Sequence, residues 1–152
     1  MNRLDKRILE ILQQDATLST AEVAERVGLS TSPCWRRIQN LEKHGVIRNR
    51  VVLVDREALN LGIDVFVSIR TRHHSATWLK TFAQAISSFE EVVEFYRMSG
   101  ETDYLMRVVV PDIPAYDRFY KRLIEEVDID DVSSSFAMER LKYTTALPVD
   151  YA

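Results

Sequence analysis

The chain has few of the residues that hold small or flexible proteins together: one cysteine, four glycines and four prolines among 152 residues. A single cysteine, Cys34, excludes an internal disulfide and any zinc site built from several cysteines. Nor is there an apolar run near the roughly 18 residues of a membrane span. The N-terminus, MNRLDKRILEILQQD, is charged and amphipathic where a signal peptide has an apolar core. We therefore expect a cytoplasmic protein.

Signatures of catalysis and metal binding are also missing. The sequence contains no GxSxG, no glycine-rich phosphate loop and no HExxH. His73 and His74 are adjacent, so in a strand their side chains point to opposite faces and cannot readily bind one metal ion. The acidic runs near residues 90, 125 and 128 are typical of solvated surface. We expect no catalytic residues, no metal and no cofactor.

Charge is distributed unevenly along the chain. Residues 1–50 contain nine Lys or Arg and six Asp or Glu, whereas residues 51–152 contain eleven and seventeen, and the net charge is −3. A basic N-terminal part can bind phosphate while the acidic remainder is repelled by it. This asymmetry favours a DNA-binding head attached to a body with another task.

The most informative stretch is LSTSPCWRRIQNLEKHG, residues 29–45. Ser30 can accept a hydrogen bond at a helix start, Pro33 is tolerated in a first turn, and Gly45 can end the helix. Helical spacing places Cys34, Ile38 and Leu41 on one side. Opposite them lie polar side chains that can form hydrogen bonds: Ser32, Arg36, Gln39, Asn40 and Lys43. Taken alone, this row could equally be an ordinary solvated face.

The preceding residues favour DNA binding. An apolar stripe at helical spacing predicts a helix over residues 4–16, and Ser19 with Glu22 forms a capping box before a second short helix. Gly28 and Leu29 then make a turn. Two helices, a glycine turn and a helix with a polar outer face are the pattern of a helix-turn-helix, whose last helix enters the DNA major groove.

The rest of the chain predicts a sheet packed with helices. The segment VIRNRVVLVD, residues 46–55, has strand composition and would lead out of the head, followed by a helical turn near residues 56–59. We then expect strands at 63–72, 92–98, 104–110 and 132–141, and helices at 76–88 and from Pro114. This βαββαβ order is the ferredoxin-like arrangement, with both helices on one sheet face.

The other sheet face would need a cover. The strands carry large apolar side chains, and a second copy of the chain would bury such a face, so we expect a homodimer. The side chains in question are Phe66, Phe95, Tyr96, Tyr104 and Phe136.

Four segments in this order resemble the Lrp/AsnC (feast/famine) family of bacterial transcriptional regulators: LDKRILEILQQD, LSTSPCWRRIQNLEKHGVI, GETDY and SSFAMERLKYTTALP. RMSGETDYLMRV and the ending are most similar to the cysteine-responsive regulator subgroup. The resemblance implies an α+β protein: a winged-type helix-turn-helix DNA-binding domain (1–48), a hinge strand and linker (49–61), and a ferredoxin-like effector-binding and oligomerisation domain (62–152). It also implies double-stranded DNA and a small amino-acid effector as partners, and dimers that often assemble into octamers.

Carried onto this sequence, the resemblance assigns DNA binding to the helix from Ser30 to His44 and its surroundings. The candidates are Thr31, Ser32, Trp35, Arg36, Arg37, Gln39, Lys43 and Arg48. Arg36 is the preferred base reader, because its planar guanidinium can make paired bonds to guanine. Trp35 could read DNA or pack, and Arg37 could contact phosphate or pair with an acid such as Glu42.

The effector loop of the family falls on Gly100, Glu101, Thr102 and Asp103, with Ser133, Ser134 and Ser135 entering the same cleft from a neighbouring dimer. A carboxylate such as Asp103 could accept hydrogen bonds from an ammonium group. The plain alternative is an ordinary hairpin loop and strand entry. At the level of function, the alternatives are an architectural DNA-wrapping protein without an effector and an amino-acid-binding module acting through a protein partner.

Overall fold

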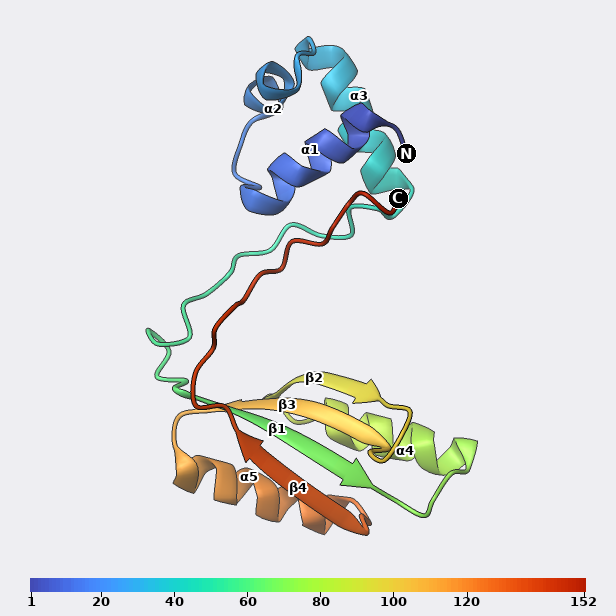
Figure 1. Ribbon diagram of the computed structural model, residues 1–152, viewed down its shortest axis with the longest axis vertical. Helices are drawn as coiled ribbons and strands as arrows, with labels where there is room; N and C mark the ends of the chain where they lie inside the picture. Colours follow the sequence, from blue (N-terminus) through green and yellow to red (C-terminus); the bar gives the residue numbers. More distant parts are fainter. The chain divides into compact units, whose positions relative to one another are not determined.

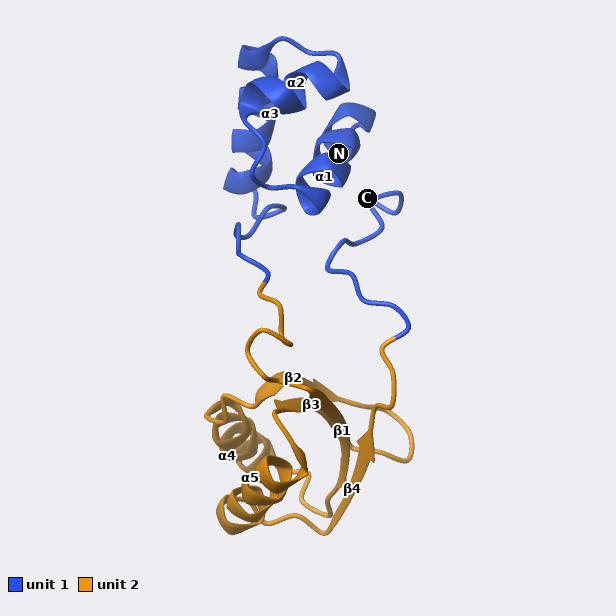
Figure 2. Ribbon diagram, turned by 90° about the vertical axis from the view of Figure 1, so that its left-hand side faces the viewer, with its two compact units in different colours: residues 1–53, 141–152 blue, residues 54–140 orange.

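The computed structural model describes residues 1–152 and contains two compact units. The helical unit comprises residues 1–53 together with 141–152, and the sheet unit comprises residues 54–140 (Figure 2). None of the helices has the length and apolar character that a transmembrane span requires.

Three helices form the helical unit: α1 (Arg3–Gln14), α2 (Thr20–Val27) and α3 (Thr31–Lys43). Each turns an apolar stripe toward a common core, because residues three and four apart lie on the same helix face. That core consists of the buried residues Ile8, Leu9, Val23, Ala24, Cys34, Ile38 and Leu41. Burial raises the pKa of the Cys34 thiol, which therefore packs as an unreactive apolar group.

Local capping sets the ends of these helices. Ser19 and Glu22 form the predicted capping box at α2, with the Ser19 N–H donating to Glu22 Oε2 over 2.7 Å. Gly28 and Gly45 have φ of 72° and 71°, the left-handed conformation that ends α2 and α3. Ser30 caps α3 by position, but its side chain makes no capping hydrogen bond. Pro33 lies three residues on, where a cap of this kind commonly finds its N–H donor, and proline has none.

The sheet unit has the predicted βαββαβ order: β1 (Ile63–Arg70), α4 (Ala76–Ser87), β2 (Val92–Arg97), β3 (Tyr104–Val110), α5 (Ile113–Glu126) and β4 (Asp131–Phe136). All pairings are antiparallel, in the strand order β2-β3-β1-β4. Both helices cover one face of the sheet (Figure 1). The core between sheet and helices is fully buried and centres on Val65, Val67, Ile69, Phe82, Met106, Val108, Phe119 and Leu123.

Alternation along the strands divides the side chains between the two faces. On β1, Val65, Val67 and Ile69 are buried under the helices, while Phe66 points to the opposite face, here called the open face, and is 40% exposed. Tyr96 pairs across from Leu105 on the open face. Phe95 and Tyr104 pack instead against Phe82 of α4, and Phe136 packs against Tyr116 of α5. The prediction that all five aromatic side chains need cover from a second copy was therefore wrong for these three.

An ion-pair network lies on the open face. The Asp64 carboxylate, 7% exposed, accepts hydrogen bonds from Arg107 Nε at 2.9 Å and from Arg56, and Arg107 also donates to Glu94 at 3.3 Å. Burial alone would raise the pKa of Asp64, but the bonds from the two arginines outweigh it and lower that pKa. Two positive and two negative groups thereby leave the centre of this face without net charge.

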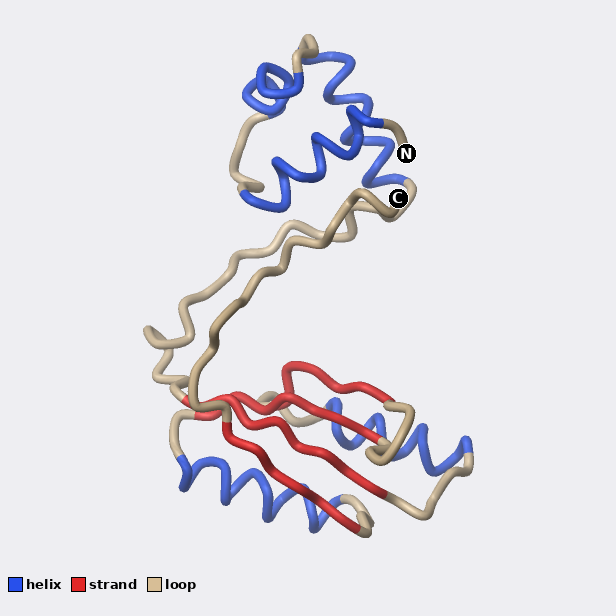
Figure 3. Tube along the Cα trace, in the orientation of Figure 1, coloured by secondary structure: helices blue, strands red, loops and turns tan.

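Three segments differ from the sequence-based expectation. Residues 46–55 form no strand, because no neighbouring strand of the chain pairs with them, and Val51, Val52 and Val54 are 64–87% exposed. β4 ends at Phe136 and not at Leu141, since its partner β1 begins at Ile63. Residues 141–152, expected in the effector domain, belong to the helical unit. Figure 3 shows residues 46–55 and the residues after Phe136 as loop, apart from the strands and helices.

Asp64→Asn should destabilise the sheet unit at pH 7 by about 1–3 kcal/mol, because two arginines lose their charged acceptor. The folded-state pKa of Asp64 is lowered, so its contribution is present above the unfolded value of about 3.9 and is lost as pH falls through the folded value. Urea unfolding from pH 7 to 3 should show the difference from wild type shrinking below about pH 4. Asp117→Asn, which breaks an exposed pair with Lys121, is the control. A difference that stays constant with pH would contradict this role.

Candidate functional site

The outward face of α3 is a continuous polar surface. Cys34, Ile38 and Leu41 are buried against α1 and α2, so the intervening positions must point to solvent. The residues of this face are all exposed: Thr31, Ser32, Arg36, Gln39, Asn40 and Lys43. Arg36 has no intramolecular bond, whereas the Gln39 amide donates to Glu42 at 2.9 Å. A helix of this kind presents hydrogen-bond donors and cations in the geometry that suits a DNA major groove.

Trp35 borders this face and is 53% exposed. It stacks on none of the other aromatic rings of the chain. About half of the Trp35 surface is therefore available to a bound molecule. An exposed indole beside Arg36 offers apolar surface and one N–H donor to a bound molecule.

Arg37 ties two helices of the helical unit together. Its Nη1 donates to Asp5 at 2.8 Å and to Asn2 at 3.2 Å, and its side chain is only 30% exposed. Burial works against ionisation of Asp5, but the hydrogen bonds from Asn2 and Arg37 lower its pKa. The partner is Asp5 and not Glu42, which pairs with Arg50 at 3.1 Å. Arg37 thus holds α3 against the start of α1.

The predicted effector loop lies between β2 and β3, with Gly100 at a φ of 110° that favours glycine. Asp103 joins this loop to neighbouring backbone by two hydrogen bonds. Its Oδ2 accepts a hydrogen bond from the Thr71 N–H at 2.8 Å, and its own N–H donates to the Ile69 carbonyl at 3.0 Å. These bonds connect the loop to the end of β1. Glu101 is exposed and lies 3.5 Å from Arg70.

The three serines of β4 do not share one face. Ser133 and Ser135 are paired with Ser68 and Phe66, which places them on the open face. Ser134 points to the helices and is hydrogen-bonded to the Tyr116 hydroxyl, whose pKa is raised by burial. The prediction that all three serines enter one cleft was therefore wrong for Ser134, because neighbouring side chains of a strand point in opposite directions.

Two residues missed by the sequence analysis lie at the same end of the open face. Ser68 is paired with Ser133, and Arg70 is paired with Asp131. Their position could have been found from the alternation of β1: once Val65, Val67 and Ile69 were assigned to the core, Ser68 and Arg70 had to lie on the opposite face. No group of three or more His, Cys, Asp or Glu side chains has an arrangement that could hold a metal ion.

Comparison with known proteins agrees with this architecture. Residues 1–48 match the family model described as winged helix-turn-helix DNA-binding, and residues 64–147 match the Lrp/AsnC ligand binding domain. The chain is 48% identical over 151 residues to the DNA-binding transcriptional activator DecR of Escherichia coli, with 99% of each chain covered. It is 49% identical over 149 residues to the glutamate uptake regulatory protein of Zymomonas mobilis, covering 98% of this chain and 91% of that one.

Two solved structures are similar over nearly the whole chain. An AsnC family transcriptional regulator from Agrobacterium tumefaciens superposes with a TM-score of 0.98 at 64% identity, covering 99% of both chains. The transcriptional regulator NMB0573 of Neisseria meningitidis, in complex with L-Met, has a TM-score of 0.94 at 34% identity, covering 99% of this chain and 98% of that one.

The chain belongs to the Lrp/AsnC family, whose members are DNA-binding transcriptional regulators and not enzymes. Within the family, the chain is about as similar to DecR as to the glutamate uptake regulatory protein.

Arg37→Ala should lower the stability of the helical unit by about 1–3 kcal/mol, because Asp5 loses a charged partner. Base preference should not change, since Arg37 points toward α1 and is engaged there. Thermal unfolding and DNA titration on a panel of single-base variants measure the two effects. The control is Arg7→Ala, whose exposed pair with Glu10 is worth about 0.5 kcal/mol or less. A change in preference at one base pair would show that Arg37 reads DNA after all.

Proposed function

We propose that this regulator reads double-stranded DNA with the outward face of α3 and that an amino acid bound at one end of the open face changes its DNA affinity. The observation that carries the first part is the unbroken exposed polar row on α3, backed by a fully buried apolar row. The second part is supported by the ligand-binding family model and by the L-Met complex of the Neisseria relative.

Within the DNA interface, the residues divide by chemistry. Arg36 is unpaired and central on α3, so its guanidinium is free for paired bonds to guanine O6 and N7. Gln39 can contact adenine when its amide leaves Glu42. Thr31, Ser32 and Trp35 lie near the start of the helix and can make further contacts to the DNA. Lys43 and Arg48 lie at the end of α3 and just after it, where a flexible cation suits a phosphate.

We further propose a homodimer that joins through the open face and assembles to an octamer, as the family resemblance implies. Phe66 and Tyr96 are 40% and 51% exposed on this face. The Asp64 network lies beside them with balanced charge, which makes this face suitable for burial. The exposed segment from Val51 to Val54 adds a second apolar surface that a partner strand would cover. Residues 49–61 are then a hinge.

The effector proposal uses the loop and the open face. One Asp103 oxygen binds Thr71, which leaves the other for an ammonium group. The N–H groups of residues 100–102 lie outside the β2–β3 ladder and can bind a carboxylate. Ser133 and Ser135 supply hydroxyls from the open face, while Ser134 is excluded by its bond to Tyr116. An amino acid carries both an ammonium group and a carboxylate, and so could use both kinds of partner.

Arg36→Ala should weaken binding to a cognate operator by about 1–3 kcal/mol and relax preference at one base pair. Lys43→Ala should weaken binding to all DNA sequences alike and reduce the salt dependence of the affinity, because the variant loses a phosphate contact. Fluorescence anisotropy with cognate and random duplexes at several salt concentrations separates the two. Equal losses on both duplexes for Arg36→Ala would contradict base reading. Uniform coating of DNA by the wild type would favour the architectural alternative.

A thermal-shift screen against the twenty amino acids should identify a ligand, since binding at 100 times Kd adds about 2.7 kcal/mol of stability. Asp103→Asn should abolish the shift while keeping an acceptor for the Thr71 N–H. Ser133→Ala should weaken the shift, whereas Ser134→Ala, on the opposite face, should retain it. Equal responses from the two serine variants would place the ligand elsewhere.

A further inference from the structure

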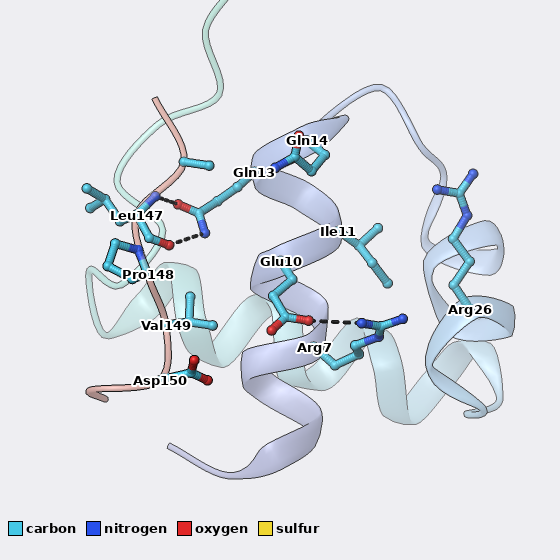
Figure 4. Close-up of a pocket in the computed structure, with 11 residues that line it drawn as sticks. Arg7, Glu10, Ile11, Gln13, Gln14, Arg26, Leu147, Pro148, Val149 and Asp150 are labelled. Carbon is cyan, nitrogen blue, oxygen red and sulfur yellow. Dashed lines mark hydrogen bonds and ion pairs between the residues drawn. The ribbon is translucent and has the colours of Figure 1, made fainter. Parts of the chain in front are cut away.

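The last residues of the chain are bound to the DNA-binding head. Residues 146–150, here called the strap, run along α1 (Figure 4). Gln13 holds the strap by both ends of its amide: its Oε1 accepts from the Leu147 N–H at 2.7 Å, and its Nε2 donates to the Leu147 carbonyl at 3.1 Å. The Gln13 amide thus makes the same pair of hydrogen bonds to Leu147 that the backbone of a neighbouring β-strand would make.

Two further contacts extend the attachment. Lys6 Nζ donates to the Asp150 carbonyl at 3.0 Å, and Val149 packs against the apolar core of the helical unit. The strap also closes one side of a cavity of about 440 Å³, whose other side is formed by α1 and Arg26. All three hydrogen bonds involve main-chain atoms of the strap. The attachment therefore depends on where the strap backbone lies and little on which side chains the strap carries.

The strap gives the helical unit a second covalent connection. The chain passes between the two units near residues 53–54 and again near residues 140–141. A head held by one linker can reorient about that linker, whereas a head held at two points loses much of this freedom.

We propose that the strap is a releasable restraint that limits how freely the DNA-binding head reorients and so narrows the range of half-site spacings the protein accepts. The inference rests on the proposed dimeric DNA recognition. Two heads must meet major grooves separated by whole turns of about 10–10.5 base pairs, so restrained heads discriminate between spacings and free heads do not. Release is easy because the strap is bound by few groups, and Leu147 itself is 73% exposed.

The experiment compares Gln13→Ala with Gln14→Ala in the full-length protein. Gln14 lines the same cavity but makes no hydrogen bond to the strap, so it is the matched control. A second variant ends at Thr145 and removes the strap altogether. Hydrogen exchange at the Leu147 N–H reports docking: it should be protected in the wild type and in Gln14→Ala, and unprotected in Gln13→Ala.

DNA binding is then measured on duplexes whose two half-sites are in phase or displaced by half a turn. The wild type and Gln14→Ala should prefer the in-phase duplex by about tenfold or more, and Gln13→Ala and the truncated chain by about threefold or less. Affinity for a single half-site should be the same in all four, since Gln13 lies on α1.

An unchanged spacing preference in Gln13→Ala, together with an unprotected Leu147 N–H, would overturn the proposed role of the strap but not the proposed DNA recognition. A wild type that does not distinguish the two duplexes would contradict the dimeric recognition on which the inference rests. A Leu147 N–H that exchanges freely in the wild type would overturn the docking itself.

Discussion

The sheet unit depends on the burial of one face of a four-stranded sheet beneath two helices. Because side chains alternate along a strand, placing Val65, Val67 and Ile69 under the helices forces the residues between them onto the other face. Asp64 must then find partners in a poorly solvated place, and Arg56 and Arg107 provide them. The same alternation places Ser133 on the open face and Ser134 on the opposite face, against Tyr116 of α5. One packing constraint thus determines which side chains the open face presents.

In the helical unit too, burial of one side of an element determines which side chains are exposed, but the period is 3.6 residues of a helix and not the two residues of a strand. Burial of one stripe of α3 leaves the opposite stripe free, and what distinguishes Arg36 from Arg37 is a rotation of one residue about the helix axis. Arg36 is without a bond inside the chain, while Arg37 joins Asp5 and stabilises the angle between α1 and α3. Of two adjacent arginines, one therefore joins two helices and the other stays free on the exposed face.

Local signals made the elements predictable. The Ser19–Glu22 box, the two left-handed glycines and the alternation in β1 and β3 are encoded within a few residues, and both units follow from them. Features set by distant partners were not predictable. Asp5 lies 32 residues from Arg37, Asp103 bonds to Thr71 across the sheet, and Gln13 meets Leu147 at a separation of 134 residues. Nor does composition alone show that residues 46–55 lack a strand partner.

The attachment of the C-terminal residues to α1 also bears on how the protein is made. The helices of the head leave the ribosome first, and N-terminal domains generally fold early during synthesis. Here the last segment of the helical unit is translated only after the whole sheet unit. The three helices can assemble beforehand, but residues 141–152 can join the head only after the sheet unit has been translated. The helical unit is therefore completed only when the sheet unit, which carries the match to the ligand-binding family model, has already been synthesised.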